Sequence, residues 1–117
     1  MTVLEFPPSS NHLYKKNKFG SIYKTKDGKA YEAKAAWAIR ANSKVVKEGR
    51  VRVNYYVWYP DNRVRDNSNL LKILDDSVKT SGVIRDDRWQ YYPITYVEAK
   101  GIDRENPRVE IEIIELA

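Results

Sequence analysis

The sequence predicts an α+β domain in which two main helices pack on a mixed, mostly antiparallel sheet. Two segments, 31–47 and 68–80, show helical spacing of apolar residues, and segments rich in β-branched and aromatic residues precede and follow them. The chain has 117 residues, enough for one modest hydrophobic core. We therefore expect residues 1–117 to form one domain.

The N-terminal third is predicted to hold a short strand and a hairpin. Residues 2–6 suit a strand that Pro7-Pro8 stops, and a turn or loop follows at 8–11. Residues 14–31 are polar and rich in lysine. Asp27-Gly28 is a hairpin signal there, with Tyr23 and Tyr31 on two short flanking strands.

A first helix is expected over about 31–47, where alanine is abundant, and Gly49 is expected to end it. Residues 50–59 form a predicted strand because they alternate and are rich in Val, Tyr and Trp. Their aromatic residues, with Trp89, Tyr91 and Tyr92, are read as core or interface rather than as stacking partners for bases.

A second helix is expected from residue 68 or 69 to 80, with Gly82 in a left-handed cap. Another strand is predicted over 94–100 and a turn over 103–107. Residues 108–113 alternate strictly, which predicts a strand with one wet face.

The composition sets broad limits on function. The chain has no cysteine, which excludes disulfides and thiolate chemistry. It has no apolar run of about 18 residues and no signal-like N-terminus, so we expect a cytoplasmic protein without a membrane partner. Residues 1–60 hold 12 Lys and Arg against 4 Asp and Glu, whereas residues 61–117 hold 9 against 12. The basic half could bind a polyanion such as nucleic acid, and the acidic half could bind a metal cation. An ordinary solvated basic surface explains the charge of the first half equally well.

The second predicted helix carries a polar face. At about 100° per residue, Asn69, Lys72 and Asp76 share one side, and the apolar Leu71, Leu74 and Val78 lie opposite. This polar row is either a functional surface or an ordinary i,i+4 lysine–aspartate pair.

Acidic residues bracket that helix. Asp66 precedes it, and Asp86 and Asp87 follow Gly82. If the segment after Gly82 packs back along the helix, these carboxylates converge and repel one another unless a divalent cation neutralises them. Carboxylates suit Mg²⁺ or Mn²⁺. The pattern indicates metal-assisted phosphodiester cleavage.

These residues resemble the RusA-type Holliday junction resolvases over most of the chain. Pro7-Pro8-Ser9-Ser10-Asn11 with Tyr14 is similar to the family's N-terminal motif, and residues 60–66 are similar to the basic stretch before its first acid. Asn69, Lys72 and Asp76 stand where the family has Asn, Lys and Asp. Asp86-Asp87 matches its later acidic pair.

The resemblance implies roles for single residues. Asp66 and Asp87 would bind Mg²⁺ (or Mn²⁺), with Asp86 adjacent, and Lys72 would be the functional lysine beside them. Asn69 and Asp76 would support the site. At Ser68 this chain departs from the family, which has its second aspartate there.

The resemblance also implies a homodimer that cuts a four-way DNA junction in pairs, since a two-fold dimer supplies two equivalent sites. The residues expected to contact DNA phosphates are Lys15, Lys16, Lys18, Lys24, Lys26, Arg63 and Arg65. Two other readings stay open at this point. One is a branched-DNA-binding protein that cuts weakly because Ser68 replaces a metal-binding acid. The other is a nucleic-acid-binding module without enzymatic activity.

Overall fold

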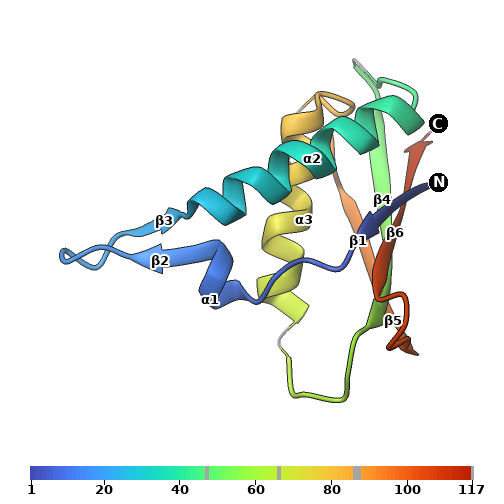
Figure 1. Ribbon diagram of the computed structural model, residues 1–117. Helices are drawn as coiled ribbons and strands as arrows, with labels where there is room; N and C mark the ends of the chain where they lie inside the picture. The colour runs from blue at the N-terminus through green and yellow to red at the C-terminus, as the bar shows by residue number, and fades with distance from the viewer. Residues whose placement is uncertain (47, 66, 86–87, 117) are drawn as a thin grey trace.

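The structure is a computed structural model that describes residues 1–46, 48–65, 67–85 and 88–116. A four-stranded sheet packs against two long helices, and a two-stranded hairpin extends away from this body (Figure 1). The elements in chain order are β1 (Thr2–Glu5), α1 (Ser10–Leu13), β2 (Tyr14–Lys16), β3 (Ile22–Lys24), α2 (Lys26–Asn42), β4 (Arg50–Tyr59), α3 (Asn67–Ser81), β5 (Ile94–Ile102) and β6 (Arg108–Leu116).

The main sheet has the strand order β1-β6-β4-β5. β6 pairs antiparallel with both β1 and β4, whereas β4 and β5 are parallel. Parallel neighbours need a long crossover, and α3 lies within the connection from β4 to β5. The predicted α+β class with a mixed, mostly antiparallel sheet is confirmed.

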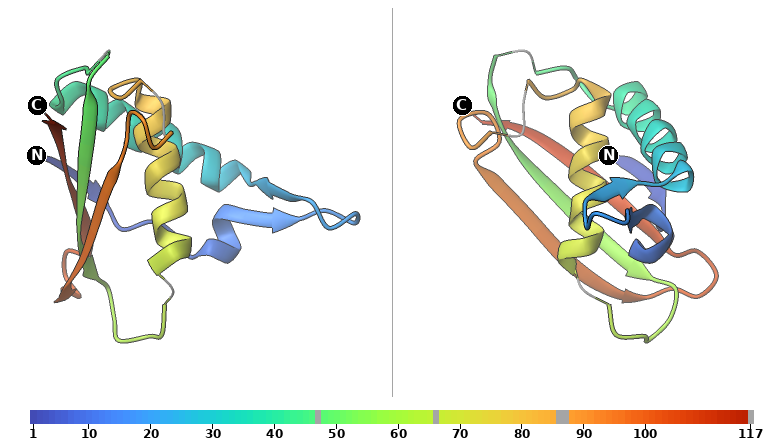
Figure 2. Two further views of the ribbon diagram at one scale, coloured as in Figure 1. Left: turned by 180° about the vertical axis from the view of Figure 1, so that it is seen from behind. Right: turned by 90° about the vertical axis from the view of Figure 1, so that its left-hand side faces the viewer.

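Both long helices cover the same face of the sheet (Figure 2). Alternate residues of β4, namely Val51, Val53, Tyr55 and Val57, are fully buried on that face. They form one core with Ile39 of α2 and the α3 residues Ile73, Leu74 and Val78. Burying these apolar side chains is the main force that holds α2 and α3 on the sheet.

The other face of the sheet carries rings and cations in contact. Arg108 lies 3.9 Å from the ring centroid of Trp58, and Arg52 lies 5.4 Å from that of Tyr96. In β6, Val109 and Ile111 are buried, whereas Arg108 and Glu110, which alternate with them, are half-buried. The expected wet face of this strand is confirmed.

The predicted hairpin turn at Asp27-Gly28 is wrong. Residues 26–42 form α2, because Thr25 caps the helix by accepting a hydrogen bond from the Gly28 N–H across 3.0 Å. The hairpin turn lies earlier, at residues 17–21. Tyr31 therefore sits in the helix, and its hydroxyl donates to the carbonyl of Glu5.

The helix predicted over about 31–47 is α2, which begins and ends about five residues earlier, at Lys26 and Asn42. It ends at Asn42, and its C-cap Ser43 has an extended backbone. Gly49 lies seven residues further along, so it does not end the helix. By contrast, Gly82 has φ +73° directly after α3, which confirms the predicted left-handed cap. Residue 10 begins a four-residue helix where a loop was expected.

No helix among the described residues is long and apolar enough to cross a membrane.

Candidate functional site

A cleft of about 250 Å³ lies at the N-terminal end of α3. It is lined by Phe6, Pro7, Pro8, Ser9, Leu13, Tyr59, Val64, Arg65, Asn69 and Leu70. The two motifs that carried the resemblance, one at 7–14 and the other at 60–72, are far apart in the sequence. The fold brings them together because β1 delivers the proline loop to the end of β4.

Arg65 is fixed on the wall of this cleft by Asp61. Its two terminal nitrogens lie 2.5 and 3.1 Å from the two carboxylate oxygens, a bidentate pair. The Arg65 guanidinium, helped by the N–H of Arg63, lowers the pKa of Asp61 to about 2. Arg65 also lies 5.6 Å from the ring centroid of Phe6.

The two arginines therefore differ in what they offer to a phosphate. Arg65 is held in place, with part of its charge offset by Asp61. The side chain of Arg63 is largely exposed. Its Nε lies 3.6 Å from Asp61 Oδ2. Of the two predicted DNA contacts here, Arg63 is the more open one.

The polar face expected on α3 is present. Asn69 and Lys72 are exposed and Asp76 is half-buried. On the opposite side, Leu74 and Val78 are buried in the core, and Leu71 is half-buried against it. The helical spacing of the sequence thus placed both faces correctly.

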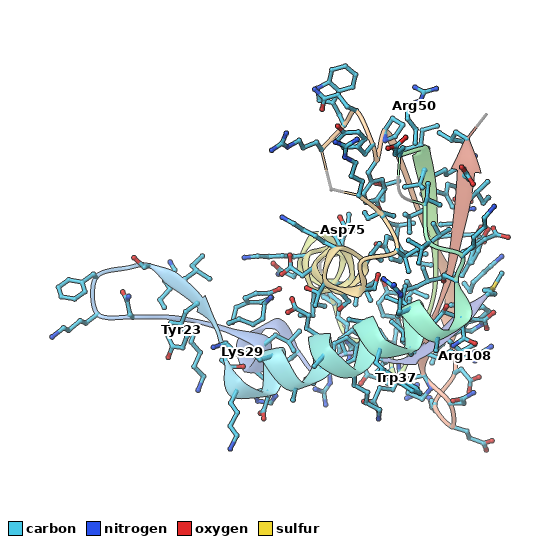
Figure 3. The ribbon with its side chains drawn as sticks, turned by 90° about the horizontal axis from the view of Figure 1, so that it is seen from above. Tyr23, Lys29, Trp37, Arg50, Asp75 and Arg108 are labelled. Carbon is cyan, nitrogen blue, oxygen red and sulfur yellow. The ribbon has the colours of Figure 1, made fainter. Side chains whose placement is uncertain are left out.

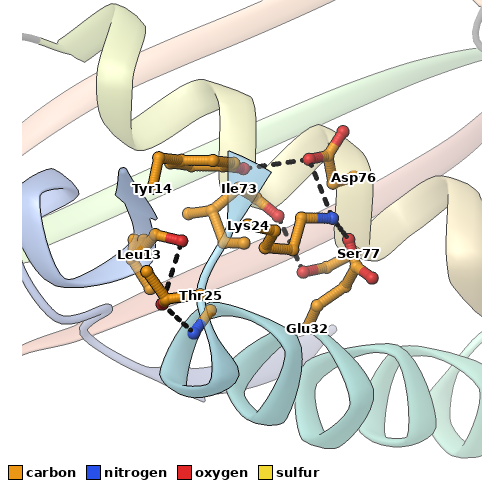
Figure 4. A network of polar contacts seen from close by, with 9 residues as sticks. Leu13, Tyr14, Lys24, Thr25, Glu32, Ile73, Asp76 and Ser77 are labelled. Carbon is orange, nitrogen blue, oxygen red and sulfur yellow. Dashed lines mark hydrogen bonds and ion pairs between the residues drawn. The ribbon is translucent and has the colours of Figure 1, made fainter. Parts of the chain in front are cut away.

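The hairpin covers part of the Asp76 side chain (Figure 4). The Tyr14 hydroxyl donates to Asp76 Oδ2 across 2.9 Å, and Lys24 Nζ lies 3.3 Å from the same oxygen. Lys24 also pairs with Glu32 on α2. Lys72 Nζ lies 4.3 Å from the ring centroid of Tyr14.

This arrangement changes the ionisation of the hairpin residues. Burial, then the hydrogen bond to Asp76, raises the pKa of Tyr14 well above 10. Burial would lower the pKa of Lys24, but its hydrogen bonds to Glu32 and Asp76 outweigh that effect and raise it. Lys24 stays charged and joins the hairpin to both helices, so less of its charge is available to DNA than the sequence suggested.

The other predicted contact lysines are more open. Lys15, Lys16, Lys18 and Lys26 are exposed, and none of them forms an ion pair with a carboxylate of the described chain. Three of them lie on the hairpin and the fourth begins α2.

Sequence reasoning missed Asp75, which joins α3 to the sheet. The hydroxyls of Tyr55 and Tyr92 donate to Asp75 Oδ1 across 2.6 and 2.9 Å. Burial raises the pKa of both phenols. The sequence did hold a signal for this role. Asp75 and Asp76 are about 100° apart around the helix axis, so Asp75 lies nearer the apolar side of α3 than Asp76 does. Tyr55 and Tyr92 are core residues, as predicted.

Asp66, Asp86 and Asp87 lie outside the described residues, as does the side chain of Ser68. In the part of the chain that is described, no three acidic or histidine side chains gather as they would around a metal ion. The predicted metal ligands therefore stay predictions.

The described neighbours of these acids lie at opposite ends of α3. Arg65 is at its beginning and Arg85 beyond its end, and a helix of 15 residues is roughly 21 Å long between its first and last Cα atoms. Beyond α3, the carbonyls of Val83 and Tyr91 accept from the N–H groups of Val46 and Val51. The described residues there stay at the far end of α3 rather than return along its polar face (Figure 1).

Comparisons with known proteins identify the family of this chain. The family model described as Endodeoxyribonuclease RusA matches residues 5–114. The chain is 33% identical over 116 residues to the crossover junction endodeoxyribonuclease rusA of Enterobacteria phage HK97, covering 97% of this chain and 92% of the phage protein. It is also 33% identical over 84 residues to the crossover junction endodeoxyribonuclease RusA of Aquifex aeolicus (strain VF5), covering 71% and 67%. The chain belongs to the RusA endodeoxyribonuclease family, which confirms the resemblance drawn from its sequence.

Proposed function

We propose that this protein is a divalent-metal-dependent endonuclease that resolves four-way DNA junctions by paired nicks as a homodimer. The observation that carries the proposal is the cleft that joins the Pro7-Pro8 loop to Arg65 and Asn69, because it brings together two of the family motifs that are distant in the sequence. Its membership of the RusA family and the names of two relatives support the substrate. With such a substrate, the proposed place of action is the cytoplasm of a bacterial or phage-infected cell.

We assign the metal site to Asp66 and Asp87, with Asp86 adjacent. The donor chemistry fits, because carboxylate oxygens suit Mg²⁺ and Mn²⁺. Asp66 and Asp87 would hold such an ion beside the DNA, where its charge would supply polarisation of the scissile phosphate and a lower pKa for the attacking water. Lys72 stabilises negative charge on the phosphate, and its contact with the Tyr14 ring restricts where its ammonium group points.

The length of α3 bears on how this site is assembled. Since the described neighbours of Asp66 and Asp87 lie at opposite ends of the helix, we propose that each site takes Asp66 from one protomer and Asp87 from the other. A two-fold axis roughly perpendicular to α3 sets the two copies of the helix antiparallel, so opposite ends meet twice. The two sites of the dimer then form together or not at all.

Mixing two inactive variants tests this assembly. Asp66→Asn and Asp87→Asn should each abolish cutting while sparing junction binding. With shared sites, a heterodimer of the two variants has one intact and one doubly changed site, so it should nick a junction once. If each protomer carried its own complete site, the mixed heterodimer would be inactive. Wild-type mixed with either variant provides the control for subunit exchange.

The activity itself is tested on a mobile four-way junction and a linear duplex, each with and without Mg²⁺ or Mn²⁺. Paired nicks across the junction support the proposal. Junction-selective binding without nicks would support the alternative, a branched-DNA-binding protein whose Ser68 weakens the metal site. Equal binding to both DNAs would contradict both. Binding should also weaken by about 0.9 log units per log unit of salt for each phosphate that a lysine or arginine neutralises.

A further inference from the structure

The tip of the β2–β3 hairpin is a tightly organised turn. Asn17 Oδ1 accepts hydrogen bonds from the N–H groups of Phe19 and Ser21 across 2.9 and 3.0 Å. The backbone of Asn17 pairs with Ser21 and with Gly20, which has φ +82°. These contacts fix the backbone that carries Phe19, so its ring is presented by an ordered turn.

Phe19 is the most exposed large aromatic residue of this hairpin, with 82% of its surface accessible. Ile22 and Tyr23 behind it are 58% and 49% exposed. The loop end of the hairpin extends beyond the helices and the sheet (Figure 3). A phenylalanine held in water at the end of a projecting arm forgoes the hydrophobic stabilisation it would gain on a partner.

The charge around the tip indicates what kind of partner this is. Lys15, Lys16 and Lys18 are exposed, and Lys18 Nζ lies 5.1 Å from the centroid of the Phe19 ring. Residues 15–29 hold six lysines and one aspartate. An exposed ring with Lys18 beside it, on an arm that carries further exposed lysines, complements a polyanion that offers flat apolar faces, which is the chemistry of unstacked nucleic-acid bases.

The base of the hairpin is attached to the helix that carries the proposed catalytic lysine. Tyr14 and Lys24 bind Asp76, and Tyr14 contacts Lys72. The hairpin thus connects Phe19, at its tip, to the helix that carries Lys72. A ring so placed can act on the same DNA that lies at the cleft.

We propose that Phe19 stacks on an unpaired or unstacked base at the branch point of a DNA junction and thereby contributes to the preference for branched over linear DNA. This inference rests on the proposed function. A linear duplex keeps its bases stacked on one another, so it offers the ring no open face. Phe19 acts as a specificity-determining residue, whereas the lysines beside it contribute affinity for either DNA.

The test measures binding in EDTA, where cutting is prevented, by fluorescence anisotropy with a labelled four-way junction and a labelled linear duplex. Phe19→Ala should weaken junction binding by about 5- to 150-fold, the equivalent of the ~1–3 kcal/mol that stacking on one base contributes. Duplex binding should change much less. Phe19→Trp should keep the preference, whereas Phe19→Leu should lose it because leucine has no aromatic face. Ile22→Ala is the matched control, since it removes another exposed apolar side chain of the same hairpin.

A second readout places the contact on the DNA. 2-Aminopurine at the branch point should change its emission when the wild-type protein or Phe19→Trp binds, but not when Phe19→Ala binds. The same probe in the middle of an arm should respond equally to all three proteins.

Three results would overturn the role of Phe19. An unchanged junction preference in Phe19→Ala, beside a junction-selective wild-type protein, removes this role alone. A change in the oligomeric state of Phe19→Ala without DNA, measured by sedimentation equilibrium, would assign the ring to contact with a second copy of the chain. Equal binding of junction and duplex by the wild-type protein would remove the proposed function and this role together.

Discussion

The Tyr14 hydroxyl donates a hydrogen bond to Asp76 across 2.9 Å, and Lys72 Nζ lies over the Tyr14 ring, 4.3 Å from its centroid. One side chain thus joins the hairpin to α3 and restricts the lysine that we assign to catalysis. Tyr14 thus contributes to holding both the hairpin and Lys72, through two different contacts.

Removing that hydroxyl should loosen the hairpin. Tyr14→Phe keeps the ring beneath Lys72 but deletes the hydrogen bond to Asp76, so we expect a loss of about 1–2 kcal/mol in the free energy of unfolding. Urea unfolding followed by circular dichroism measures it. Tyr23→Phe is the control, because it deletes a hydroxyl from an exposed tyrosine of the same hairpin and should change stability little. Equal stability of the two variants would contradict this account.

Asp75 should matter more for stability than its position on α3 suggests. Asp75→Ala leaves the hydroxyls of Tyr55 and Tyr92 without their acceptor, and Tyr55 is fully buried. Each unpaired buried polar group costs about 1–3 kcal/mol, so we expect a destabilisation of about 2–4 kcal/mol, measured by urea unfolding. Glu105→Ala, in an exposed turn, should stay near the wild-type value. A similar loss in both variants would show that Asp75 has no special role.

The buried tyrosines should make stability fall at high pH. Burial raises the pKa of Tyr31, Tyr55 and Tyr92 above their ordinary value of 10.0. The folded protein therefore keeps protons that the unfolded chain releases above about pH 10. Stability should be complete below that pH and fall above it by up to ~1.4 kcal/mol per pH unit for each tyrosine.

Urea unfolding as a function of pH measures this slope. Tyr31→Phe removes one titrating group, so the fall in the free energy of unfolding with pH should become shallower by the share of one tyrosine. The lost hydrogen bond to Glu5 lowers stability by the same amount at every pH and does not change this slope. A stability that did not change above about pH 10 would show that the folded protein releases these protons over the same pH range as the unfolded chain, which would contradict the raised pKa of its tyrosines.

Gly28→Ala should destabilise the protein, although alanine is usually the better helix former by about 1 kcal/mol. A Cβ at Gly28 would lie 2.4 Å from the carbonyl oxygen of Leu13 and 2.9 Å from Lys24 Cγ. The first contact is with backbone, so α1 or the start of α2 has to shift. Thermal unfolding of Gly28→Ala and of Lys29→Ala, an exposed neighbour, compares the two effects. A raised melting temperature for Gly28→Ala would contradict the close approach.

Ser68→Asp should lower the Mg²⁺ concentration needed for half-maximal cutting of a junction. The change restores the aspartate that the family resemblance implies at this position, and a carboxylate binds Mg²⁺ more strongly than a neutral hydroxyl. Ser68→Asn is the matched control, because it has nearly the shape of aspartate without the charge. If both variants behaved alike, the charge at residue 68 would have no part in metal binding.

Much of the fold follows from local sequence patterns. The strand at 50–59 was predicted with its observed bounds, and the helix from 68 or 69 to 80 differs by one or two residues from α3. Both segments have strong periodicity and clear breakers, namely Pro60 after the strand and Gly82 after the helix. Local physics determined these elements.

The hairpin shows why local patterns fail elsewhere. Asp27-Gly28 has the composition of a turn, but Thr25 caps a helix there and Gly28 is needed for its close approach to Leu13. The actual turn depends on Asn17, whose side chain closes it with hydrogen bonds to Phe19 and Ser21. These are interactions of particular atoms, and residue composition does not distinguish them.

The sequence by itself determined the α+β class, the two faces of the second helix and the family to which the chain belongs, because periodicity and motif order are properties of the chain. Only the tertiary structure decided that Asp76 is covered by Tyr14 and Lys24, that Asp75 binds two tyrosines, and that Phe19 stands at the end of a projecting arm. Each of these depends on which distant segments pack together. That choice is made by the burial of the whole core, which no single segment encodes.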